Sequence, residues 1–79
     1  MREGTLTLRV GLGHDPDLLL RDIFAEHLQS VRLISTATAK QGAALDLTYT
    51  IRFRPEGNLI AFVNVLNKKD GVQNVEVKQ

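Results

Sequence analysis

The sequence contains no cysteine and no tryptophan among its 79 residues. The lack of cysteine excludes disulfides, thiolate metal sites and cysteine-based catalysis. Basic runs are also missing, because the longest is Lys68-Lys69 and the formal net charge is only +1. Proteins that bind nucleic acid usually carry a basic stripe, since neutralising phosphates supplies much of their affinity. The charge pattern therefore predicts that nucleic acid is not a partner.

Long apolar runs are missing as well. No run approaches the roughly 20 apolar residues that a membrane-spanning helix needs. The first ten residues, "MREGTLTLRV", lack the apolar core of a signal peptide. These absences predict a soluble, cytoplasmic domain. Its length is enough for a single domain over residues 1–79, with one small core.

Four segments alternate between apolar and polar residues, which is typical of strands with one buried side. They are residues 5–12, 30–39, 44–54 and 72–77. In the first, Leu12 is expected to share the apolar side. In the second, Ile34 breaks the alternation and is expected to face the polar side together with Thr36 and Thr38.

Two further segments have helical spacing, the first over residues 16–28 and the second after Asn58, which is expected to be its N-cap. Asp15 can accept hydrogen bonds from the free N–H groups of the first helix, and Pro16 suits its first position. The second helix is expected to end at Gly71, which would act as a left-handed cap.

The resulting order, β-α-β-β-α-β, predicts an α+β fold of the ferredoxin-like class. Right-handed crossovers would fold it into one four-stranded antiparallel sheet, in the order 4-1-3-2, with both helices on one face. RNA-binding domains of this topology display aromatic residues on the open face to stack bases. Here Tyr49 and Phe53 alternate with the core side, so the open face is predicted to be polar and rich in threonine.

The first loop, "GLGHDPD" over residues 11–17, is either a ligand site or only the junction of a strand and a helix. Its candidate ligand-binding residues are Gly11, Gly13, His14 and Asp15. A histidine beside an aspartate could serve metal or acid–base chemistry, but neighbouring side chains diverge and no third ligand is near. We therefore expect no metal and no cofactor. Arg52 and Arg54 form either an anion site or part of an exposed strand face.

Acylphosphatases share this topology and offer an enzymatic alternative. Their chemistry needs an arginine and a phosphate cradle in the first loop, together with an asparagine that positions water. Residues 11–17 contain no arginine, and Asn64 and Asn67 fall in the second predicted helix. The chain is accordingly predicted not to be an enzyme, with an acylphosphatase-type activity as a distant alternative.

The segments "HDPDLLLRDIF" and "NVLNKKDGVQNVEV" resemble the first loop and the ending of ACT domains. The resemblance implies a regulatory module that pairs with a second copy and often binds an amino acid at the interface through the first loop. Asp17 departs from the pattern, because amino-acid-binding members usually have glycine there. Its negative side chain would crowd a ligand carboxylate.

A second resemblance covers residues 31–77, which look like the ACT-like C-terminal cytoplasmic tails of bacterial multi-pass membrane proteins of the MgtC type and a related group. It implies a regulatory or assembly role at the inner face of a membrane, with this chain as a piece of a longer protein. A stand-alone sensor of a small ligand is the alternative.

Self-association is expected from the strand edges. The last strand ends in charged residues that discourage pairing, whereas the stretch from Ser30 to Ala39 has Arg32 as its only charge. A homodimer would form either by pairing of the second strands or by packing of the open sheet faces. The candidate interface residues are Ile34, Thr36 and Thr38.

Overall fold

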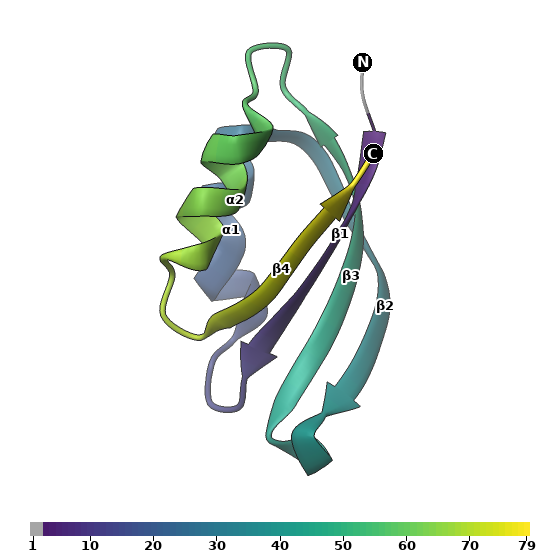
Figure 1. Cartoon of the computed structure of the whole chain (residues 1–79), viewed down its shortest axis with the longest axis vertical. Helices are drawn as coiled ribbons and strands as arrows, with labels where there is room; N and C mark the ends of the chain where they lie inside the picture. The colour runs from purple at the N-terminus through teal and green to yellow at the C-terminus, as the bar shows by residue number, and fades with distance from the viewer. Residues whose placement is uncertain (1–2) are drawn as a thin grey trace.

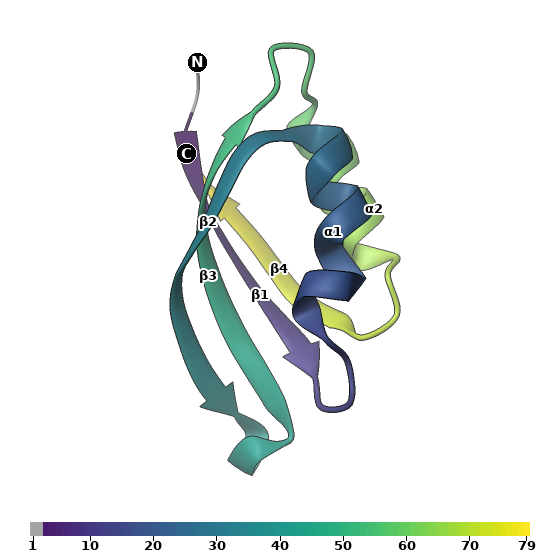
Figure 2. The same ribbon diagram turned by 180° about the vertical axis from the view of Figure 1, so that it is seen from behind.

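The computed structural model describes residues 3–79 and has the predicted order of elements (Figure 1). The strands and helices are β1 (Glu3–Gly11), α1 (Pro16–His27), β2 (Leu28–Ala39), β3 (Ala44–Phe53), α2 (Leu59–Asn67) and β4 (Val72–Lys78), with a short 3-10 turn, η1 (Lys40–Gly42), between β2 and β3. The sheet is antiparallel and ordered β2-β3-β1-β4. Both helices cover one face of it (Figure 2). The predicted ferredoxin-like fold and strand order are confirmed.

The core lies between the helices and the two central strands. Every second residue of β1 and β3 is buried on the helix side, and the register sets Leu6 opposite Tyr49 and Leu8 opposite Leu47. The helices supply four buried side chains to the same cluster: Leu20, Ile23, Phe62 and Leu66. No helix in the described part of the chain is long and apolar enough to cross a bilayer.

The start of α1 follows the sequence prediction. Asp15 has an extended backbone, and its carboxylate accepts a hydrogen bond from the Asp17 N–H at 3.0 Å. Pro16, which lacks an N–H, occupies the first helical position. Asn58 is the corresponding N-cap of α2, and its side-chain oxygen accepts a hydrogen bond from the Ala61 N–H at 3.0 Å. Both predicted caps are therefore present.

Asp15→Ala is expected to lower the free energy of unfolding by about 0.5–2 kcal/mol, because one N–H of the first turn loses its acceptor. Urea denaturation followed by circular dichroism measures this change. Asp22→Ala is the matched control, since Asp22 is an exposed residue further along the same helix. That exposed substitution should stay within about 0.5 kcal/mol of the parent. Equal costs for the two variants would show that the cap contributes nothing.

The end of α1 differs from the prediction, because the helix passes into β2 without a loop. Leu28, expected as the last helical residue, is extended and buried, and its N–H donates to the Phe24 carbonyl. Two carbonyls of the last turn accept hydrogen bonds from Arg54, the residue that follows β3. The Arg54 guanidinium donates to the Ala25 carbonyl at 2.9 Å and 3.3 Å, and the Arg54 N–H donates to the His27 carbonyl at 3.3 Å. This arrangement fixes β2 directly beside α1.

The facing of the second half of β2 was predicted wrongly. The pairing with β3 shifts between Leu33 and Ser35, so one extra residue enters the strand. Beyond the shift, Thr36 lies opposite Leu47 and Thr38 opposite Leu45. Since directly opposed residues point to the same face, both threonines lie on the helix side rather than on the open face.

Two smaller predictions also need correction. Leu12 is 77% exposed, because β1 ends at Gly11 and the chain turns before Leu12 can join the core. Gly71 is not the residue that ends α2, since Lys68 is the C-cap. Gly71 has a φ of 91° within the following turn, where the Val72 N–H donates to the Lys69 carbonyl.

Candidate functional site

The second strand is the part of the sheet that the helices leave uncovered. It lies at one edge and pairs only with β3, so its outer backbone groups meet no other strand of the described chain. All ten residues from 29 to 38 are exposed. Three of them are large and apolar, namely Val31 at 40%, Leu33 at 50% and Ile34 at 52% exposure. Such an edge is a template for pairing with another strand.

Val31 and Leu33 belong to the helix side of the sheet. They lie opposite Ile51 and Tyr49, whose side chains are buried beneath the helices. The helix layer does not extend over β2 (Figure 2). Their exposure therefore results from the missing cover at this edge, and not from a polar environment.

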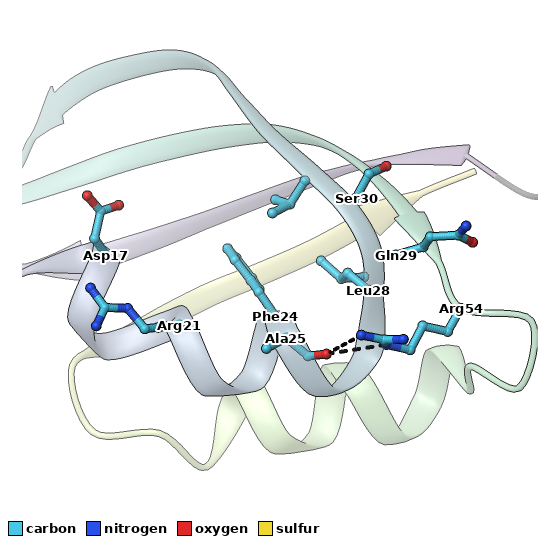
Figure 3. A pocket seen from close by; sticks show the side chains of 9 residues that line it. Asp17, Arg21, Phe24, Ala25, Leu28, Gln29, Ser30 and Arg54 are labelled. Atoms are coloured by element: carbon cyan, nitrogen blue, oxygen red, sulfur yellow. Dashed lines mark hydrogen bonds between the residues drawn. The ribbon is translucent and has the colours of Figure 1, made fainter.

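A groove runs between α1 and β2, which we call the α1–β2 groove. Its narrower part has a volume of about 190 Å³ and is lined by Pro16, Asp17, Leu20, Phe24, Val31, Leu33 and Tyr49. Its wider part, an open hollow of about 600 Å³, continues past Val31 to Leu28, Gln29, Ser30 and Arg54 (Figure 3). Phe24 points from α1 toward the strands and lines both parts.

The rim of the groove carries charges of both signs. Asp17 and Arg21 come from the first half of α1, and Arg54 closes the far end (Figure 3). The Arg54 guanidinium is held on the Ala25 carbonyl, which limits its freedom to bind an anion. An apolar floor with a mixed polar rim suits the side chains of an extended segment laid along an edge strand.

Tyr49 forms part of the groove wall and is the only tyrosine of the chain. Its ring meets Phe24 edge-on, with 5.2 Å between the centroids. Burial raises the pKa of the Tyr49 phenol to about 12, and the nearby negative charge of Asp17 acts in the same direction. The groove thus favours the neutral form of the hydroxyl group.

The folded protein is expected to show a tyrosinate absorbance midpoint near pH 12, against an ordinary value of 10.0. Because the folded pKa is raised, the stability linked to this group is complete below pH 10 and is lost as the pH rises toward 12. The chain has one tyrosine and no tryptophan, so near-ultraviolet absorbance reports this group alone. Tyr49→Phe should remove the tyrosinate absorbance change and also the part of the stability loss at high pH that comes from this phenol. A midpoint near 10 before unfolding would contradict the burial argument.

The first loop is held by contacts within the fold. The Gly11 N–H donates to the Gly71 carbonyl at 3.0 Å, and the Leu12 N–H donates to the Ala43 carbonyl at 2.9 Å. Gly13 has a φ of 96°, as a turn glycine does. The His14 ring lies against Gly71, where a β-carbon would come within 2.7 Å of it. Several donors that a ligand would need are therefore already used.

The candidate ligand-binding residues are neighbours but line neither part of the α1–β2 groove. Gly11 and His14 approach each other, while Asp15 serves as the helix cap. Within residues 3–79, no group of three or more histidine, cysteine, aspartate or glutamate residues is placed to hold a metal ion. The groove itself was missed from the sequence, although the break in alternation at Ile34 marked the strand that borders it.

The two arginines considered as an anion site are separated by the fold. Arg52 lies on the open face, where it pairs with Glu3, its cross-strand neighbour. Arg9 pairs with Asp46 in the same way, with 2.8 Å between Nε and Oδ1. The hydrogen bond from Arg9 lowers the pKa of Asp46. The open face therefore alternates compensated ion pairs with threonines and offers no concentrated charge.

Comparison of the sequence with protein-family models gives no match, and no curated protein matches it. The structural features that bear on function are therefore the edge strand β2 and the α1–β2 groove.

Proposed function

We propose that this chain is a non-enzymatic regulatory or assembly domain that acts by pairing with a second copy of itself through β2. The observation that carries the proposal is the uncovered edge strand, in which Val31, Leu33 and Ile34 are all exposed. Soluble proteins usually protect such edges with charges, bulges or a covering element. An apolar edge of this kind is readily explained if another strand covers it.

The opposite edge supports the assignment to β2. The strand β4 has 7 residues, whereas β2 has 12. Its pairing with β1 is irregular near Asn74, whose φ is 56°, and it carries Glu76 and Lys78. Bulges and charges are the features that keep an edge strand from pairing. The strand β2 also has register shifts, but its stretch from Ser30 to Leu33 is regular and Arg32 is its one charge.

We further propose that the domain is the cytoplasmic tail of a bacterial membrane protein. This part is supported by the resemblance of residues 31–77 to such tails. An antibody raised against the domain would test it on fractionated cells of the native organism. A band larger than 8.8 kDa in the membrane fraction is the expected result. A band of 8.8 kDa confined to the soluble fraction would refute the membrane assignment.

Leu33→Lys is expected to abolish self-association, because it would place a charge within the apolar part of the contact. Ile60→Lys is the matched control, since Ile60 is 67% exposed but lies on α2, away from β2. Analytical ultracentrifugation compares the two variants with the parent at the same concentration, and circular dichroism checks that each is folded. Loss of the dimer in the Leu33 variant alone supports the proposal. Equal dissociation in both folded variants, or in neither, contradicts it.

A further inference from the structure

We infer, on the basis of the proposed self-association, that the two-fold axis of the pair passes beside Val31, so that Val31 and Leu33 of one copy close the α1–β2 groove of the other. The inference selects one geometry from those open to an edge strand of 12 residues. It follows from three constraints, namely the facing of the strand, its irregularities and its single charge.

The first constraint is the symmetry of an isologous contact. When a strand pairs with its own copy in an antiparallel ladder, the residue on the axis lies opposite itself and its two neighbours lie opposite each other. The ladder is regular only if the side chains of the axis residue and its two neighbours point alternately to opposite faces of the sheet. The position of the axis therefore depends on which part of β2 is regular.

The second constraint comes from the pairing of β2 with β3. The register is continuous from Ser30 to Leu33 and shifts on either side of that stretch. Only Val31 and Arg32 have a regular neighbour on both sides within it. An axis in the later regular stretch, residues 35–39, would place Val31 opposite Gln41 or a later residue, beyond the end of β2, so it does not account for the exposure of Val31.

The third constraint is electrostatic. An axis at Arg32 would set two guanidinium groups directly opposite each other, and like charges at that spacing are destabilising. An axis at Val31 sets Val31 opposite Val31 and Arg32 opposite Ser30. The two Arg32 guanidinium groups are then not opposite each other, and each faces the hydroxyl group of Ser30 in the other copy.

This register also fits the shape of the groove. With Val31 on the axis, Leu33 of the second copy lies beside Gln29, on the helix side of the joined sheet. Gln29, together with Leu28 and Arg54, lines the wider part of the groove (Figure 3). The incoming Leu33 would thus form the outer wall of a hollow that a single copy leaves open. The groove is complete only when the second copy contributes this side chain.

The contact would be short, which bears on its strength. The regular residues centred on Val31, from Ser30 to Arg32, span only about 10 Å at the usual rise of a strand. Stable interfaces bury about 800 Å² on each partner, and that would be roughly a sixth of the 5074 Å² surface of this chain. A short ladder flanked by one helix is therefore expected to give a weak dimer, in the micromolar range.

The test uses single-cysteine variants, because the chain has no cysteine of its own. Val31→Cys, Leu33→Cys and the control Ile60→Cys are oxidised with copper phenanthroline at a concentration where sedimentation shows the parent to be dimeric. A residue on the axis meets itself at a Cα separation of about 4.5–5.5 Å, within the range a disulfide allows. The expected result is crosslinking of Val31→Cys at least about tenfold faster than that of either other variant.

Three outcomes would overturn the inference. Faster crosslinking of Leu33→Cys would move the axis to that residue. Crosslinking only in a mixture of Val31→Cys and Leu33→Cys would move it to Arg32. No crosslinking in a protein that sediments as a dimer would assign the contact to a surface other than Val31 and Leu33, and would overturn pairing through this part of β2 as well. A protein that is monomeric throughout would instead overturn the proposed function.

Discussion

Phe62→Ala is expected to lower the free energy of unfolding by about 3–5 kcal/mol, the usual cost of removing a buried aromatic ring. Phe62 is 0% exposed and lies at the centre of the contact between the helices and the sheet. Its ring meets Phe53 edge-on at 5.4 Å and lies 6.3 Å from Phe24 and 5.5 Å from His27. Its removal would leave a cavity that no neighbouring element can readily close.

The loss is large against the whole stability of the domain. At about 0.05–0.15 kcal/mol per residue, a chain of 79 residues is stabilised by roughly 4–12 kcal/mol. Urea denaturation followed by circular dichroism measures the difference. Ile60→Ala, in the first turn of the same helix, is the control and should change stability by no more than about 0.5 kcal/mol. A cost below about 1 kcal/mol for Phe62→Ala would mean that this ring does not organise the core.

Gly71→Ala is expected to cost about 1–3 kcal/mol, because its φ of 91° is strained for any residue with a β-carbon. The new methyl group would also come within 2.7 Å of the His14 ring and displace it from the first loop. Gly42→Ala is the control, since Gly42 has a φ of 90° but no atom within 4 Å of the added carbon. Thermal unfolding should show the larger loss at Gly71.

A double variant separates the two causes of that loss. His14→Ala should cost less in the Gly71→Ala background than in the parent, because the ring has already lost its contact. A coupling of at least about 0.5 kcal/mol is expected for groups in direct contact. Strict additivity would show that His14 does not join the first loop to the turn before β4.

The fold could be read from the sequence wherever one side of an element is buried. The strands β1 and β3 alternate cleanly because every second side chain enters the core, and a slip of one residue would expose all of them. Asp15 and Asn58 were recognisable as caps because few residues can satisfy the free N–H groups of a first turn. These local rules, together with the right-handed crossover, were sufficient for the strand order.

The facing of Thr36 and Thr38 could not be read in this way. From residue 29 to 38, β2 has no buried side chain, so the alternation of apolar and polar residues does not indicate which side of the strand faces the helices. An extra residue between Leu33 and Ser35 then reverses the facing of everything that follows. Ile34 stood out in the sequence as an irregularity, but only the pairing with β3 shows that the strand shifts there.

The α1–β2 groove could not be predicted from the sequence for a related reason. It depends on α1 ending directly at Leu28 and on Arg54 binding the Ala25 carbonyl, and both are consequences of packing between distant segments. The first loop, in contrast, was considered as a ligand site because its glycines and histidine lie close together in the sequence. In the structure those residues join β1 to the turn before β4, while three neighbouring exposed apolar side chains, Val31, Leu33 and Ile34, lie along β2.

Sedimentation equilibrium of the unmodified protein tests the central claim most directly. Self-association through β2 predicts that the weight-average mass rises from 8.8 kDa toward twice that value as the concentration approaches about 100 μM. The rise should be reversible on dilution, because the contact is expected to be weak. A mass that stays at 8.8 kDa across the whole range would contradict the account.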